Sequence, residues 1–191
     1  MSTTTAPETG LSTAFPSPGT WAIDTAHSTV GFVVRHLVAA KARGRFGEFA
    51  GDIHVADRPE ESSVVVEIAA ASIDTGQPDR DAHLRSPDFF DVEQFPTIGF
   101  RSTAARMRDE HRFEVDGDLT VHGVTKPVTL TVEYGGVVRD PFGNEKAIFS
   151  AEAELNREDF GLTWNQALET GGVLVGKTAK IELEIEATRQ A

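Results

Sequence analysis

The segment Lys177–Ala187 reads KTAKIELEIEA, and its side chains alternate between apolar and charged along most of its length. Because successive side chains of a β-strand point to opposite faces, this alternation predicts a strand with one buried and one solvated face. Such strands are typical of antiparallel sheets, since strands of parallel sheets are usually apolar on both faces. The segment therefore predicts an antiparallel β-protein.

The same alternation recurs along the chain, whereas no long segment keeps the period of a helix. Eight principal strands are predicted, at about residues 30–36, 45–56, 63–71, 97–104, 112–121, 127–138, 145–156 and 177–187, after a short strand at 21–24. A sheet of this size must split into a sandwich or close on itself. Because most links are short and several strands are long, we predict an all-β fold, an extended antiparallel up-and-down barrel forming one domain over residues 21–188.

Two connections, 72–96 and 157–176, are too long to be simple turns. The first contains Pro78–Arg85, which we predict to be a short helix because proline suits the first helical turn. Asp88–Val92, with two adjacent phenylalanines, is predicted to form a second turn. Because both connections are rich in aromatic residues, we expect them to be ordered covers over one mouth of the barrel.

The aromatic composition is unusual, with twelve Phe against two Trp and one Tyr. Phe buries a large area and has no polar atom that needs a partner, so the interior of the barrel should be strongly apolar. Rows of inward-facing apolar side chains give the same sequence pattern whether they fill a packed core or line an open tunnel. Both alternatives therefore stay open at this point.

Charge and composition exclude several classes of protein. The formal net charge of −12 disfavours general nucleic-acid binding and permanent electrostatic docking on anionic membranes. The absence of cysteine excludes disulfides, thiolate metal sites and cysteine nucleophiles. Residues 1–20 are rich in Ser, Thr, Pro and Gly and have neither a basic start nor an apolar signal segment, so we predict a disordered tail and a cytoplasmic location.

No motif for catalysis or metal binding is present in the sequence. The six histidines are scattered without a metal-ligand spacing, and there is no GxSxG motif or phosphate-binding glycine loop. His36 follows the parity of Val30, Phe32 and Val34, so it should face either a core partner or the head group of a ligand. Arg80 and His83 belong to a charged cluster near the predicted mouth and are candidates for holding an anionic or carbonyl-bearing head group.

The sequence resembles the YceI-like family of polyisoprenoid-binding, lipocalin-like proteins over about Trp21 to Ala187. The motifs that carry the resemblance are Trp21–Asp24 with His27-Ser28, Val30–His36, Gly44–Gly47 with Gly51, Ile73–Gly76, Arg80–Ser86, Asp88–Phe90, Phe95-Pro96, Gly117–Thr125 and Asn156–Gly161. No single motif is diagnostic, but together and in this order they are a strong indication.

The resemblance implies an eight-stranded barrel that binds a long isoprenoid lipid, such as a quinone or a polyprenyl phosphate, without catalysis and without a required cofactor. It also implies a homodimer in many members and, through the lipid ligand, a transient contact with a membrane. We expect the lipid tail to contact Phe32, Val34, Phe49, Ile68, Ile98, Phe100, Phe149 and Trp164, and the head group to contact His36, Arg80, His83 and Asn156.

Two other hypotheses stay open from the sequence. One is an enzyme that acts on a small apolar substrate with His36 or His83 as the base. The other is a filled barrel that acts as an acidic stress or interaction protein. The first predicts turnover that is lost when either histidine is removed, and the second predicts phenylalanine rings that meet across the barrel axis.

Overall fold

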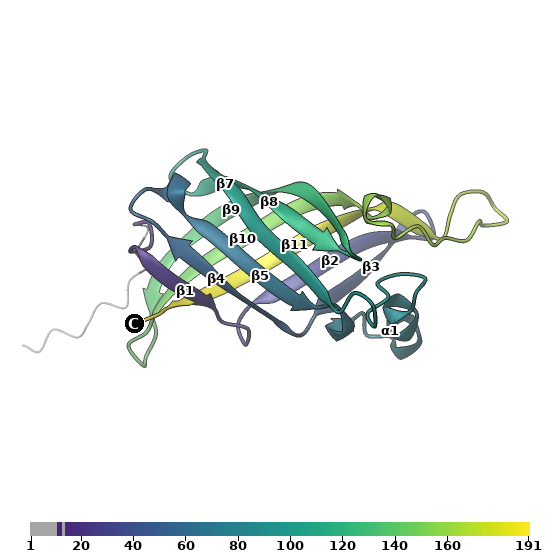
Figure 1. Ribbon diagram of the computed structural model, residues 1–191, viewed down its shortest axis with the longest axis horizontal. Coiled ribbons are helices and arrows are strands. Elements are labelled where there is room, and N and C mark those ends of the chain that lie inside the picture. Colours follow the sequence, from purple (N-terminus) through teal and green to yellow (C-terminus); the bar gives the residue numbers. More distant parts are fainter. Residues whose placement is uncertain (1–10, 13) are drawn as a thin grey trace, which may run out of the picture.

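The computed structural model, which describes residues 11–12 and 14–191, is a closed antiparallel β-barrel with a short α-helix at one end (Figure 1). Its strands are β1 (Gly19–Ile23), β2 (Thr29–His36), β3 (Ala40–Phe46), β4 (Phe49–Val55), β5 (Ser63–Ala69), β6 (Ile73–Asp74), β7 (Thr97–Met107), β8 (Arg112–Val121), β9 (Val124–Arg139), β10 (Glu145–Asn156) and β11 (Val175–Arg189). Its helical segments are α1 (Pro78–Arg85) and the 3₁₀ turns η1 (Pro59–Glu61), η2 (Ala70–Ser72) and η3 (Arg157–Phe160).

The ring of the barrel runs β1-β4-β5-β7-β8-β9-β10-β11 and closes where β11 pairs with β1. Strand β11 is long enough to pair with β1 near its carboxyl end and with β2 along the rest of its length. Strands β1 and β2 act as two halves of one interrupted strand, and β3 and β4 as two halves of the next, because β1 pairs with β4 and β2 with β3. The predicted eight-stranded antiparallel barrel is therefore confirmed.

The boundary predicted least well lies between β3 and β4. The sequence predicts one strand over 45–56, whereas β3 begins at Ala40 and the ladder is interrupted at Gly47 and Glu48. There the backbone pairs elsewhere: the Gly47 amide donates to the Ser72 carbonyl at 3.1 Å, and the Ala69 amide donates to the Glu48 carbonyl at 2.9 Å. Strand β3 reads AKARGRF and escapes prediction because it has no large apolar residue before its last position.

The core consists of two apolar clusters. One cluster is centred on Val30, Phe46, Ile73 and Phe160, and packs under the helical segments. The other surrounds Trp21, which is 1% exposed and packs with Val55, Ala147 and Ala187. Several large inward side chains between the clusters, Phe32 and Phe100 among them, are only half-buried. Incomplete burial inside a barrel indicates empty space next to these side chains.

Figure 1 shows α1 and the segment before β11 at one end of the barrel, and the carboxyl terminus at the other. We call these the α1 end and the opposite end. The helix predicted at Pro78–Arg85 is confirmed, with proline in its first turn. Arg85 fixes it to the barrel, since its guanidinium donates to the carbonyls of Ala71 and Ile73, each at 2.8 Å. The turn predicted over residues 88–92 is present, within turns at 87–90 and 92–94.

The segment before β1 contributes to the opposite end of the barrel. Ser12 and Val137 exchange two backbone hydrogen bonds, and the Tyr134 hydroxyl donates to the Ala14 carbonyl at 2.6 Å. The ring of Phe15 lies 5.6 Å from that of Phe113. These contacts extend the folded domain upstream of Trp21, into the predicted tail of residues 1–20, of which residues 1–10 and 13 lie outside the described residues.

A membrane-spanning helix would need a long apolar run. None of the helices in the described part of the chain has the length and apolar character to cross a membrane.

Candidate functional site

The barrel encloses an apolar cavity of about 450 Å³. The inner faces of the strands form its wall, because period-two alternation places every second side chain inward. All the residues that the sequence predicts as tail contacts line this cavity, namely Phe32, Val34, Phe49, Ile68, Ile98, Phe100, Phe149 and Trp164. The inward rows thus enclose open space instead of meeting on the axis, and the volume lies in the range of small-molecule sites.

Two glycines keep the wall thin where phenylalanine rings lie against it. Gly44 on β3 pairs with Phe32 on β2, and a Cβ on this glycine would lie 2.3 Å from Phe32 Cζ. Gly117 on β8 pairs with Ser102 on β7 and lies diagonal to Phe100, yet a Cβ on this glycine would lie 2.4 Å from Phe100 Cζ. The rings therefore lie over the glycines, along the wall, and this arrangement leaves the axis of the barrel open.

Sequence reasoning missed part of the lining. Phe113, Leu119, Leu130 and Ile185 follow the same inward parity as the predicted set, so the signal was present in the alternation. Phe15 also lines the cavity but had no such signal, because it is a single aromatic residue in a segment rich in Ser, Thr and Pro. The parity rule finds the wall of the cavity and not the segment that covers its end.

An aromatic cluster covers the cavity at the α1 end. The His83 ring on α1 meets Trp164 edge-on, with centroids 4.7 Å apart, and meets Phe89 in the same way at 5.1 Å. His83 Nε2 also lies 2.8 Å from the Asp88 carboxylate, which fixes the orientation of the ring. His83 and Trp164, assigned by sequence to head and tail, are therefore in contact with each other and line the same cavity.

Arg80 lines the cavity at the same end, but part of its guanidinium is occupied. Arg80 Nε donates to Thr75 Oγ1 at 2.7 Å, and Nη2 donates to the Thr75 carbonyl at 2.9 Å. The buried Asp81 accepts from the Thr75 amide at 2.9 Å, so α1 is tied to the loop before it. Arg80 is consequently a rigid positive group at the cavity wall.

Arg157 is a buried ionisable residue of the lining that sequence reasoning did not select. It is 6% exposed, and its guanidinium donates to three carbonyls: Gly176 at 2.8 Å, Leu162 at 2.5 Å and Val175 at 3.4 Å. Burial lowers the pKa of Arg157, because desolvation disfavours the charged form. None of the ion pairs in the described residues includes it. Arg157 is thus a buried cation balanced by dipoles and not by a carboxylate.

The electrostatics of the cavity differ from those of the whole chain. Although the net charge is −12, no carboxylate occurs among the described residues that line the cavity. Its ionisable lining consists of arginines and histidines: Arg35, His36, Arg43, Arg80, His83 and Arg157. Arg80 and His83 belong to α1, Arg157 belongs to η3, and His36 ends β2, so the arginines Arg80 and Arg157 and both histidines lie toward the α1 end. The cavity therefore combines an apolar interior with a cationic end.

Two predicted head-group residues differ in their placement. His36 lies in the lining, half-buried at the end of β2. Asn156 lies outside the lining and is exposed; its side-chain oxygen accepts from the Glu158 amide at 3.0 Å and caps η3. Asn156 ends β10, where alternation with the inward residues Ala153 and Leu155 already places it outward. Its prediction as a head-group contact rests on its position beside a long loop and not on parity. The geometry gives no support to its predicted contact with a head group.

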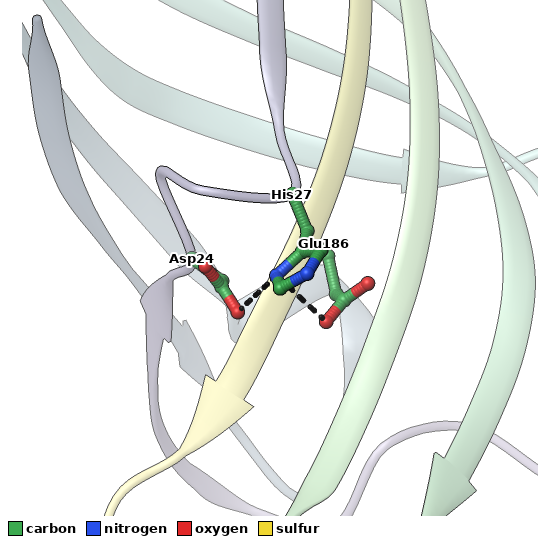
Figure 2. Close-up of side chains that lie close together, drawn as sticks. All are labelled: Asp24, His27 and Glu186. Carbon is green, nitrogen blue, oxygen red and sulfur yellow. Dashed lines mark hydrogen bonds and ion pairs between the residues drawn. The ribbon is translucent and has the colours of Figure 1, made fainter. Parts of the chain in front are cut away.

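A cluster on the barrel wall has the composition of a metal site. Figure 2 shows His27 between Asp24 and Glu186, with the Asp24 carboxylate 3.0 Å from His27 Nδ1. Lys146 Nζ lies 2.6 Å from Asp24 Oδ2 and 3.1 Å from Glu186 Oε1, and so neutralises the same carboxylates. The Lys146 hydrogen bond is the main cause that lowers the pKa of Asp24 to about 2. This geometry is that of an ion-pair cluster around a buried ammonium group.

Comparisons with known proteins agree on one family. The family model of the YceI-like domain matches residues 21–187. A UPF0312 protein of Pseudomonas putida (strain GB-1) is 35% identical over 165 residues, covering 86% of this chain and 82% of the relative. A UPF0312 protein of Staphylococcus aureus (strain N315) is 36% identical over 168 residues, covering 85% of this chain and 94% of the relative.

Solved structures show the same barrel. The Campylobacter jejuni YCEI protein superposes with a TM-score of 0.69 at 30% identity, covering 88% of this chain and 96% of that chain. Burkholderia cenocepacia BcnA has a TM-score of 0.77 at 22% identity, covering 87% and 99%. A polyisoprenoid-binding domain from Saccharophagus degradans has a TM-score of 0.66 at 14% identity, covering 89% and 98%. The last two similarities concern the fold alone.

Proposed function

Because the chain belongs to the YceI-like domain family, we propose that it binds a long-chain isoprenoid lipid inside the barrel and carries or sequesters it without chemical change. The observation that supports this proposal most is the cavity of about 450 Å³ whose wall is made of inward apolar rows. A related fold occurs in a domain described as polyisoprenoid-binding. An isoprenoid chain is apolar along its whole length and needs no polar partner in such a wall.

The energetics favour binding by the tail. Each buried CH₂ group contributes about 0.8 kcal/mol, so one isoprene unit contributes roughly 3–4 kcal/mol before the costs of ordering. A few units inside the cavity therefore suffice for tight binding. Because every unit makes the same kind of contact, the wall selects for apolar character and a slender shape, and only the length of the cavity limits the chain.

The head group is proposed to lie at the α1 end. Arg80, His83 and Arg157 line this end, whereas the described lining contains no carboxylate to repel an anion. The opposite end is lined by apolar and small polar residues such as Phe15, Val55 and Ser62. This asymmetry favours a lipid that enters tail first and leaves an anionic or carbonyl-bearing head beside the arginines.

Mass spectrometry of solvent extracts tests the proposal. Protein purified without detergent should release a prenyl lipid in about stoichiometric amount. Ala151 lines the cavity, so Ala151→Phe should lower the yield, whereas Ala104→Phe on the exposed side of β7 should not. Repeated absence of any prenyl lipid from the native protein, together with no binding of added geranylgeraniol, would overturn the proposal.

A further inference from the structure

The turn between β2 and β3 exposes two large apolar side chains. Leu37 is 50% exposed and Val38 is 61% exposed, and both are placed at the tip of the hairpin by the pairing of His36 with Ala40. Their φ values are 50° and 66°, in the left-handed region. Tight hairpin turns with such angles usually carry Asn and Gly, and a β-branched residue such as Val38 is strained there. Neither the conformation nor the burial of these residues explains the choice of Leu and Val.

The tip belongs to the rim of the cavity. The Leu37 amide donates to the Leu174 carbonyl at 2.9 Å, and His36 and Leu174 both line the cavity. Val38 packs against the same segment, since a Cβ on Gly172 would lie 3.1 Å from Val38 Cγ2, and the adjacent Val173 is 42% exposed. We call Leu37, Val38 and Val173 the apolar tip. In Figure 1 the hairpin and the segment before β11 lie at the α1 end.

The hairpin is basic, although the protein is acidic. Residues 35–46 contain Arg35, Lys41, Arg43 and Arg45 and no carboxylate, in a chain whose net charge is −12. Arg43 pairs with Glu182 at 3.3 Å and Arg45 with Asp74 at 3.4 Å. Arg35 and Lys41, which flank the tip, are exposed and occur in none of the ion pairs within residues 11–12 and 14–191. The tip therefore presents apolar side chains between two unneutralised cations.

We propose that the apolar tip docks the protein on an anionic lipid bilayer, with Leu37, Val38 and Val173 inserted at the surface and Arg35 and Lys41 at the level of the lipid phosphates. Apolar side chains flanked by cations are the combination that anionic membrane surfaces bind. Docking would place the cavity rim at the bilayer surface, where a lipid can pass directly into the barrel. The transfer of a lipid from the bilayer into the barrel rests on the proposed function, whereas the docking itself does not.

Charge argues against two alternatives, a dimer formed through the apolar tip and membrane docking through the opposite end. A symmetric contact between two copies through this tip would bring the same cations, Arg35 and Lys41, close together. The opposite end also exposes an apolar residue, Phe142, at 89%. Its hairpin contains Asp140 and Glu145 against Arg139, and the 56–62 segment contains Asp57, Glu60 and Glu61 against Arg58, so both segments have a net negative charge that an anionic surface would repel.

Vesicle flotation with the full chain tests the proposal. Binding to phosphatidylcholine vesicles that contain phosphatidylglycerol should exceed binding to pure phosphatidylcholine vesicles by about 25-fold, from roughly fivefold for each of the two cations. Lys41→Gln should remove about fivefold of the binding to anionic vesicles and leave binding to neutral vesicles unchanged. High salt should weaken anionic binding in the same direction.

The double variant Leu37→Asn/Val38→Gly separates docking from folding. Asn and Gly adopt the turn angles without strain, so the melting temperature should equal or exceed that of the wild type. Vesicle binding should nevertheless fall by tenfold or more, because the inserted side chains are gone. The matched control is Phe142→Ser at the opposite end, which should leave vesicle binding unchanged.

Three outcomes would overturn the proposal: no preference of the wild type for anionic vesicles, unchanged binding by the double variant, or equal loss in Phe142→Ser. Self-association of the wild type that the double variant abolishes, without any vesicle binding, would show instead that the tip binds a second copy. Binding of geranylgeraniol delivered from cyclodextrin is measured in parallel. Wild-type protein that binds this probe but no vesicle refutes docking alone, and the reverse result refutes the proposed function alone.

Discussion

The ring of Phe32 lies over Gly44, its partner across the β2–β3 ladder, so closely that a Cβ on the glycine would lie 2.3 Å from Phe32 Cζ. All three atoms nearest to that Cβ position belong to the Phe32 ring. If a side chain is added at position 44, the Phe32 ring can move away from it only into the cavity, because the barrel wall blocks movement outward. Any side chain at position 44 therefore moves Phe32 toward the axis of the barrel.

Gly44→Ala should accordingly narrow the cavity and weaken isoprenoid binding while the barrel stays folded. Displacement of about two CH₂ groups of ligand corresponds to an affinity loss of roughly tenfold. Isothermal titration with geranylgeraniol measures the affinity, and thermal unfolding checks the fold.

The double variant Gly44→Ala/Phe32→Leu is the control, because the smaller side chain leaves room for the added methyl group. Binding should recover in the double variant. Gly117 is a less specific position, since a Cβ there would also lie 2.7 Å from the Arg101 backbone carbonyl. A Gly44→Ala variant with unchanged affinity would show that the ligand does not pass Phe32.

The buried position of Arg157 predicts that the cavity prefers a lipid with an anionic head group to one with a neutral head group. Arg157→Gln should lower the affinity for geranylgeranyl phosphate by about tenfold or more relative to geranylgeraniol, because the buried cation lines the cavity without a carboxylate partner. The ratio of the two affinities is the measurement, since loss of the carbonyl contacts will also lower stability.

Arg157→Lys serves as the matched variant because it keeps the charge but not the planar donor set. It should retain most of the preference for the phosphate. Equal loss of affinity for the alcohol and the phosphate in Arg157→Gln would assign this arginine to the architecture of the barrel end and not to the head group.

The wall of the cavity could be predicted from the sequence because it depends on strand alternation alone. Phe32, Phe100 and Ile98 line the cavity where parity places them. The openness of the bore could not be predicted in this way. It depends on which residues of the neighbouring strand lie beside each phenylalanine, and the placement of Gly44 beside Phe32 is set by the register between strands.

The ends of the barrel were predicted less well, for a different reason. Alternation along β10 places Asn156 outward, where it caps η3, and extended by one residue it places Arg157 inward, where it is buried. Asn156 was predicted as a head-group contact because it lies beside a long loop, and this criterion does not tell inward from outward residues. Phe15 was missed because one apolar residue in a polar segment has no periodic signal, although it packs against Phe113 and lines the cavity.

The ion-pair cluster of Figure 2 predicts a pH-dependent contribution to stability. The pKa of Asp24 is lowered from 3.8 to about 2, chiefly by the hydrogen bond from Lys146, and the difference corresponds to about 2 kcal/mol. Because the pKa is lower in the folded state, this contribution is present above about pH 4 and is lost as the pH falls through 2.

Asp24→Asn should thus lower the free energy of unfolding by about 2 kcal/mol at pH 7, and by progressively less as the pH approaches 2. Urea unfolding of both proteins at several pH values measures the difference. Asp52→Asn, on an exposed carboxylate of β4, is the control and should change the unfolding free energy by less than about 0.5 kcal/mol. A difference between Asp24→Asn and wild type that does not vary with pH would contradict this interpretation.

Adjacent alanines on β7 test the direction in which the lipid lies. Ala105 lines the cavity and pairs with Val115, two residues from the pairing of Met107 with Phe113 at the opposite end. Ala104 is exposed on the outer surface. If the head group lies at the α1 end, a phenylalanine at position 105 blocks the far part of the tail, and one at position 104 blocks nothing.

Ala105→Phe should then lower the affinity for a long prenol such as solanesol by at least tenfold, with little change for farnesol, because only the longer chain reaches this depth. Ala104→Phe should bind solanesol and farnesol as the wild type does. It adds the same ring to β7 on the outer surface, so it controls for effects of the ring outside the cavity. Competition between the two prenols on one sample measures the ratio directly. Equal weakening of both prenols by Ala105→Phe would mean that short chains also occupy the opposite end, and the proposed tail-first orientation would have to be reversed.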